Sequence, residues 1–129
     1  MKQEEYNFIR SIRDEAIQRL YVTMRRTGDY ACLSDICEHI AEMPMPLHYI
    51  SYRMARQAFN NHFHRGRQTT RMWPQKRRMY DSFIQRCREL ATPGRDEREV
   101  IMEALLSPAP CVGLSPSMIR RILVRHGAR

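Results

Sequence analysis

Residues 43–51 read MPMPLHYIS, and residues 107–115 read SPAPCVGLS. Both segments contain Pro-x-Pro, and in both a serine follows the second proline five residues later. Proline disfavours helical geometry in the residue before it and has no backbone N–H to donate, so each segment predicts the end of a helix. A serine hydroxyl accepts a hydrogen bond from the free amides of a first helical turn, so Ser51 and Ser115 predict the starts of two further helices.

Away from these segments the apolar residues recur at spacings of three and four, the pattern of amphipathic helices. We expect six helices, at about residues 2–26, 34–42, 51–62, 74–91, 96–106 and from 115 onward. Ser34 is expected to cap the second helix and Pro74 to open the fourth. Arg10 and Arg13 of the first helix and Arg125 of the last are expected to face water. No strand pattern is convincing, so the predicted fold class is all-α.

The two halves of the chain resemble each other at an offset of 64 residues. The Pro-x-Pro segments align, Ser51 aligns with Ser115, and Met54 aligns with Met118. We therefore expect one helical domain built from two pseudo-symmetric halves, about 1–64 and 74–126, which share one core and are joined by a basic linker at 65–73.

Length and composition fit a single globular domain, with 129 residues, 43% hydrophobic and 28% charged. The N-terminus has no apolar run that would serve as a signal peptide, and no window approaches a membrane span, so we expect a cytoplasmic protein without membrane contact. The four cysteines form no C-x-x-C pair. They are expected to be small buried hydrophobic residues rather than disulfide partners or zinc ligands.

The positive charge of the chain gathers between Arg65 and Arg88. This segment holds eight basic residues against Asp81 alone, whereas the rest of the chain is nearly neutral and the net charge is +8. A compact basic segment creates a local positive potential that attracts a polyanion, most often nucleic acid. We expect phosphate contacts mainly from six residues of its first part: Arg65, Arg67, Arg71, Lys76, Arg77 and Arg78.

Trp73 stands at the end of the basic linker and is the only tryptophan of the chain. An indole at this place could stack on a base of a single-stranded partner. A lone tryptophan is usually largely buried, however, so we expect Trp73 to pack the linker onto the core.

Each Pro-x-Pro segment connects a short helix to a capped helix with outward arginines. This arrangement resembles a helix-turn-helix. The resemblance implies that Arg53 and Arg56, with their counterparts Arg120 and Arg121, meet DNA. The two connections are about twice the usual turn of three or four residues, so the motif would be a variant. A helical hairpin with solvated arginines is the alternative. The Pro-x-Pro form ahead of an arginine-bearing helix is also similar to short uncharacterised bacterial proteins associated with mobile DNA, which implies an accessory role on nucleic acid.

No nucleophile elbow, phosphate-cradling glycine loop or zinc-protease pattern occurs in the sequence, so we expect no enzymatic activity, cofactor or metal site. The predicted function is nucleic-acid binding, to duplex DNA rather than RNA, mainly through phosphates. The alternative is a helical interaction module whose basic face docks on an acidic protein partner, and a homo-oligomer is a third. Exposed methionines beside a groove, such as Met43, Met45 and Met72, would support the protein partner.

Overall fold

The computed structural model describes residues 2–66 and 72–128. In this part of the chain six helices form and no strand does, which confirms the predicted all-α class. The helices are α1 (Lys2–Thr27), α2 (Leu33–Glu42), α3 (Tyr52–Phe63), α4 (Pro74–Leu90), α5 (Glu97–Leu105) and α6 (Pro116–Arg125). Ser51 and Ser115 cap α3 and α6 as expected, each accepting at 3.3 Å from the amide three residues later.

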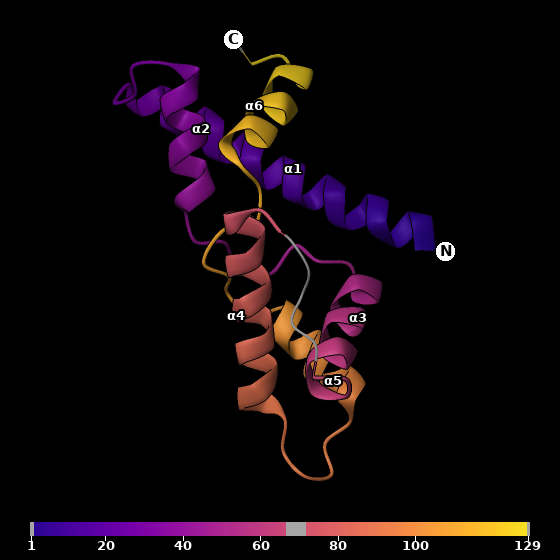
Figure 1. The fold of residues 1–129 in the computed structure, drawn as a ribbon. Helices are drawn as coiled ribbons and strands as arrows, with labels where there is room; N and C mark the ends of the chain where they lie inside the picture. Colours follow the sequence, from indigo (N-terminus) through magenta and orange to yellow (C-terminus); the bar gives the residue numbers. More distant parts are fainter. Residues whose placement is uncertain (1, 67–71, 129) are drawn as a thin grey trace.

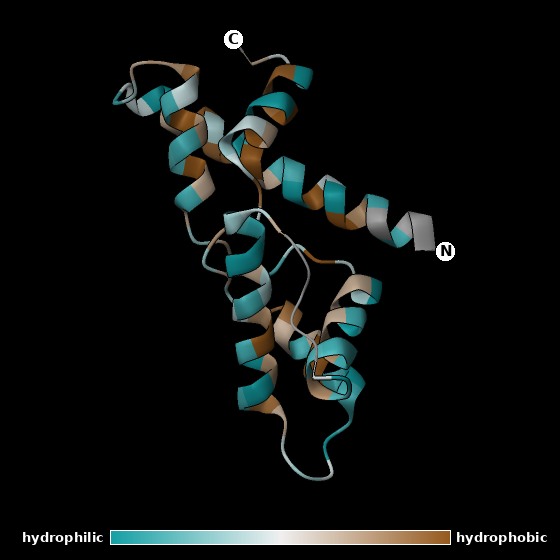
Figure 2. Ribbon diagram, in the orientation of Figure 1, coloured by the Kyte–Doolittle hydropathy of each residue, from teal (hydrophilic) through white to brown (hydrophobic). Residues whose placement is uncertain are grey.

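The six helices form two lobes (Figure 1). In the first lobe α1, α2 and α6 all pack against one another. In the second lobe α3, α4 and α5 all pack against one another. Each lobe has its own cluster of buried apolar side chains, around Ile17, Ile36 and Ile119 in the first and around Phe83 and Ile101 in the second. Figure 2 shows the hydrophobic residues on the helix faces that meet within each lobe. Each lobe therefore combines helices from both halves of the sequence.

The chain passes between the lobes through the two Pro-x-Pro segments, which we call the first crossing segment (residues 43–51) and the second crossing segment (residues 107–115). They run antiparallel and are joined by one reciprocal pair of backbone hydrogen bonds, Met45 N to Ala109 O and Ala109 N to Met45 O, both 2.9 Å. Because proline has no N–H, the residue between the two prolines is the only donor in each Pro-x-Pro. The two donors satisfy each other.

The paired residues Met45 and Ala109 are separated by 64 positions, the offset that relates the two halves in sequence. At this offset α1, α2 and α3 correspond to α4, α5 and α6. The contacts between helices follow this correspondence: the contact of α1 with α2 corresponds to that of α4 with α5, and the contact of α2 with α6 corresponds to that of α5 with α3. An origin by duplication stays a prediction.

Two local predictions were wrong, the helix cap at Ser34 and the burial of Cys32. Ser34 does not cap α2, because the helix begins at Leu33 and its N-cap is Cys32, which makes no side-chain cap bond. Cys32 is itself exposed, whereas Cys37, Cys87 and Cys111 are buried as expected, and all four thiols are free. Burial raises the pKa of Cys87 to about 12, as befits a thiol that packs as a small apolar side chain.

Gly113, in the second crossing segment, is held in the left-handed region at φ +82°, and a Cβ there would lie 2.6 Å from Cε of Met79. Gly94 has a similar φ of +84° but open space around it. Gly94→Ala should cost about 1–2 kcal/mol of unfolding free energy from backbone strain alone, and Gly113→Ala up to about 1 kcal/mol more, because the flexible end of the Met79 side chain must also shift. Urea denaturation of both variants measures the difference, and equal losses would contradict a constraint from Met79.

His48, in the first crossing segment, is only 1% exposed. Its Nε2 lies 3.0 Å from Ser82 Oγ on α4, and its Nδ1 has no hydrogen-bond partner at normal geometry. Burial lowers the pKa of His48, and the nearby carbonyls at the end of α5 offset this only in part.

Because the folded state resists protonation of His48, the unfolded state binds more protons once the pH falls below the ordinary value of 6.5. The free energy of unfolding should therefore be constant with respect to this group above that pH and should fall below it. Urea denaturation across the acidic range tests this, with His48→Gln expected to flatten the pH dependence and the exposed His126→Gln expected to leave it unchanged. The same acid sensitivity in His48→Gln would contradict the assignment.

Candidate nucleic-acid interface

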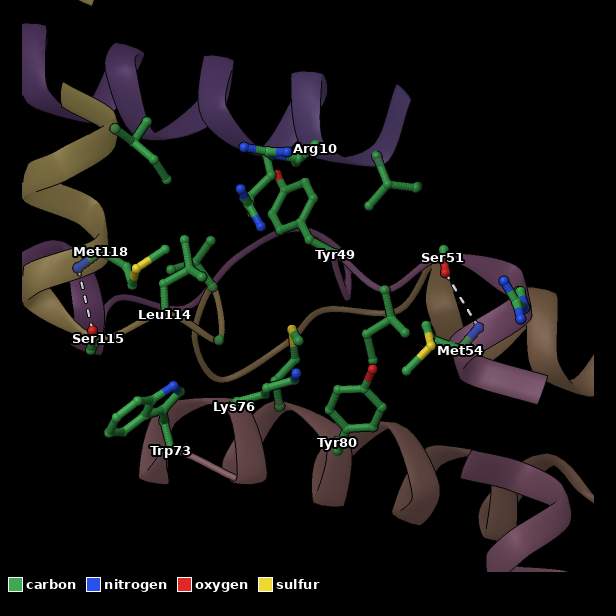
Figure 3. A pocket seen from close by; sticks show the side chains of 18 of the residues that line it. Arg10, Tyr49, Ser51, Met54, Trp73, Lys76, Tyr80, Leu114, Ser115 and Met118 are labelled. Carbon is green, nitrogen blue, oxygen red and sulfur yellow. Dashed lines mark hydrogen bonds between the residues drawn. The ribbon is translucent and has the colours of Figure 1, made fainter. Parts of the chain in front are cut away.

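A pocket of about 680 Å³ opens between the two lobes. In Figure 3, α1 forms one wall and α4 the other, the two crossing segments lie behind, and the capped starts of α3 and α6 stand at opposite ends. Its volume is within the range of ordinary ligand sites. The pocket exists because the chain crosses between lobes, which leaves the first turns of α3, α4 and α6 facing the side of α1.

Five basic side chains line this pocket, and among the described residues that line it none is acidic. They come from four helices: Arg10 and Arg13 on α1, Arg53 on α3, Lys76 on α4 and Arg125 on α6. Positive charges gathered in a hollow with low-dielectric walls concentrate the local potential more than charges spread over a convex surface. The arrangement suits an anionic ligand. We call these five residues the basic pocket set.

Two members of the basic pocket set are held in place by neighbours. Arg13 forms an ion pair with Asp14 at 2.9 Å, and both side chains are largely buried, with 16% and 13% of their surface exposed, so this pair adds little net charge to the pocket. Lys76 places its ammonium 6.0 Å from the centre of the Tyr80 ring, a cation–π contact that keeps it on the pocket side of α4. Burial raises the pKa of Tyr80 to about 12, so this ring stays neutral under Lys76.

At the two ends of the pocket, the first turns of α3 and α6 have few backbone amides that could bind an anion. At α3, Glu5 Oε1 accepts from Tyr52 N at 2.5 Å and Ser51 accepts from Met54 N. At α6, Ser115 accepts from Met118 N, and Pro116 has no amide hydrogen. Anion binding here would therefore depend on the basic side chains rather than on helix amides.

Trp73 is 67% exposed at the edge of the pocket, so the prediction that it packs onto the core was wrong. It lies on the same helical stripe as Tyr80 and Phe83, which are buried. The first turn of α4, however, extends past the core of the second lobe into the space between the lobes (Figure 1). Trp73 and Lys76 therefore face the pocket, whereas the later turns face the core.

Of the eight predicted site residues that the structure describes, two line the pocket, Arg53 and Lys76. Arg78 instead forms an ion pair with Glu42 on α2 at 2.8 Å, which raises its pKa and leaves little net charge at that place. Arg77 is half-buried on α4, and Arg65 is exposed just after α3. Arg67 and Arg71 lie outside the described residues.

The arginines of the capped helices do not form one face. Because α2 and α3 lie in different lobes, as do α5 and α6, neither pair packs as the compact hairpin that joins neighbouring helices (Figure 1). Arg56 is exposed on α3, in the second lobe, and Arg121 is exposed on α6, in the first. Arg120 donates to Ser34 Oγ on α2 at 3.4 Å. The resemblance to a helix-turn-helix stays a prediction.

Sequence reasoning missed three members of the basic pocket set: Arg10, Arg13 and Arg125. Arg10 and Arg13 are partly buried, so the prediction that they face water was wrong, whereas Arg125 is exposed as predicted and also lines the pocket. One signal was present in the sequence. Arg13 precedes the buried Ile17 by four residues, so it shares the inward stripe of α1.

Acidic residues gather elsewhere. A second hollow, of about 580 Å³, lies along α2 and the turn before it, and its carboxylates are Asp29, Asp35, Glu38 and Glu42. No group of three or more possible metal ligands occurs among the described residues. This acidic hollow is separate from the pocket between the lobes, and its Glu42 is the partner of Arg78.

No protein-family model, curated protein or solved structure matches this chain. Within residues 2–66 and 72–128 no helix has the length and apolar character that a membrane crossing needs.

The exposure of Trp73 can be tested by fluorescence, because it is the only tryptophan of the chain. Acrylamide should quench its emission nearly as well in the folded protein as in urea, since the indole is already open to water. Strong protection in the folded state would mean that the ring is buried.

Proposed function

We propose that this protein binds nucleic acid through the pocket between its lobes, mainly by contacts to phosphates. The observation that supports the proposal is the convergence of five basic side chains from four helices on one hollow with no acidic residue among its described lining. Arginine and lysine neutralise phosphates and release condensed counterions, so such a site gains affinity for a polyanion without base-specific contacts. The exposed Arg56, Arg65 and Arg121 would extend the positive surface beyond the pocket.

An acidic protein partner is the alternative. Of the methionines named in support of it, Met45 is buried and Met43 and Met72 are half-buried, whereas Met54 is 40% exposed and lines the pocket. An acidic protein carries a lower and less regular charge density than a phosphate backbone. It therefore releases fewer condensed counterions, and salt dependence separates the two partners.

The test is fluorescence anisotropy of labelled single-stranded and duplex DNA of mixed sequence, titrated with the protein between about 50 and 200 mM salt. About four phosphate contacts should give a slope of log affinity against log salt of roughly −3 for a single strand and −4 for a duplex. Arg53→Gln combined with Arg125→Gln should weaken binding to all sequences and make the slope less steep by about 1–2.

Arg26→Gln is the matched control, because Arg26 is exposed and lies about 20 Å along α1 from Arg13. It removes one positive charge without touching the pocket, so it should change affinity much less than Arg53→Gln alone or Arg125→Gln alone. No binding to any nucleic acid at low salt would overturn the proposal. An equal loss from the control and the pocket variants would place the binding surface elsewhere.

A further inference from the structure

Among the described residues that line the pocket, one aromatic ring is open to a ligand. Tyr49 and Tyr80 also line it, but they are only 8% and 4% exposed, against 67% for Trp73. The backbone of Trp73 is held by α4, since Trp73 is the N-cap of this helix and its carbonyl accepts from Arg77 N at 2.9 Å. A large apolar ring presented to water from the end of a helix, beside a basic hollow, is the arrangement by which proteins stack an unpaired base.

Lys76 stands one helical turn after Trp73, on the same side of α4, and is held there by Tyr80. Three residues of helix advance by about 4.5 Å, which is short enough for one nucleotide to place its base on the indole and its phosphate at the ammonium. Leu114 and Met118 line the same end of the pocket as Trp73 (Figure 3). They give an apolar boundary to the space in front of the ring.

The concave shape of the pocket favours a single strand of nucleic acid over a duplex. A duplex keeps its bases stacked in pairs, and proteins reach base edges with a helix or ribbon that protrudes into a groove. Here the basic side chains that the structure describes line a concave pocket with the indole at its edge, an arrangement unlike a helix laid into a groove. A single strand is the form of nucleic acid whose backbone can enter the pocket while a base turns onto Trp73.

Resting on the proposed function, we infer that the ligand of this pocket is a single-stranded segment, with an unpaired base stacked on Trp73 and the flanking phosphates held by Lys76 and the arginines of the basic pocket set. This differs from the duplex expected from sequence. A free nucleotide shares the chemistry of base and phosphate, but it would engage only part of the basic pocket set, whereas a strand offers several phosphates to side chains from four helices.

The test uses the emission of Trp73 as its readout, because no other tryptophan contributes. The full-length protein is titrated with a single-stranded oligonucleotide, a duplex, an abasic oligomer of the same length and a mononucleotide. The single strand should quench the emission, the abasic oligomer should bind with little quenching, and the mononucleotide should bind at least about tenfold more weakly than the strand.

Two substitutions of Trp73 measure how much stacking contributes to affinity, apart from the contribution of the basic side chains. Trp73→Ala should weaken single-strand binding by roughly 5- to 150-fold and leave binding of the abasic oligomer unchanged, while Trp73→Phe should restore most of the affinity. Leu106→Ala is the control, since Leu106 is equally exposed at 67% but does not line the pocket.

Single-strand binding that is unchanged in Trp73→Ala, or tighter binding to the duplex than to the strand, would overturn the inference while the proposed function stands. A mononucleotide that binds as tightly as the strand would overturn it too. Absence of binding to every ligand, in wild type and variants alike, would instead overturn the proposed function.

Discussion

The reciprocal hydrogen bonds between Met45 and Ala109 are the contact on which the arrangement of this fold depends. Prolines on both sides of each residue remove the neighbouring donors, so neither crossing segment can extend into a longer strand. The two remaining donors satisfy each other at the place where the segments meet. This contact holds the two crossings together, and the crossings carry α3 into the lobe of α4 and α5 and α6 into the lobe of α1 and α2.

The pocket follows from the same crossing. Because each lobe has its own apolar core, the lobes meet through the crossing segments and leave a hollow between α1 and α4. Like charges from four helices face this hollow, an arrangement that costs folding free energy and that stable proteins usually retain for binding. Asp14 pairs with Arg13 at 2.9 Å, whereas four further carboxylates lie in a separate hollow along α2. The described lining of the pocket therefore keeps an excess of positive charge.

Much of the local structure was predictable. The six helices and the serine caps of α3 and α6 follow from apolar spacing and from cap chemistry, both of which act within a few residues. The candidate site was predicted only in part. Lys76 belongs to the basic segment and reaches the pocket, but Arg78 from the same segment is paired with Glu42 of another helix. Trp73 was predicted to be buried because tryptophan residues usually are. That general tendency does not account for a helix such as α4, whose first turn extends past the core of its lobe.

The sequence by itself determined where helices begin and end, and it determined that the positive charge is concentrated, because turn, cap and charge patterns are properties of neighbouring residues. Only the tertiary structure decided which helices share a lobe, and hence that Arg10, Arg13 and Arg125 face Lys76 across one pocket. The physical reason is that the apolar stripe of a helix does not by itself specify which other stripe it packs against. The choice among these partners depends on the long-range contact between the crossing segments, which no local pattern contains.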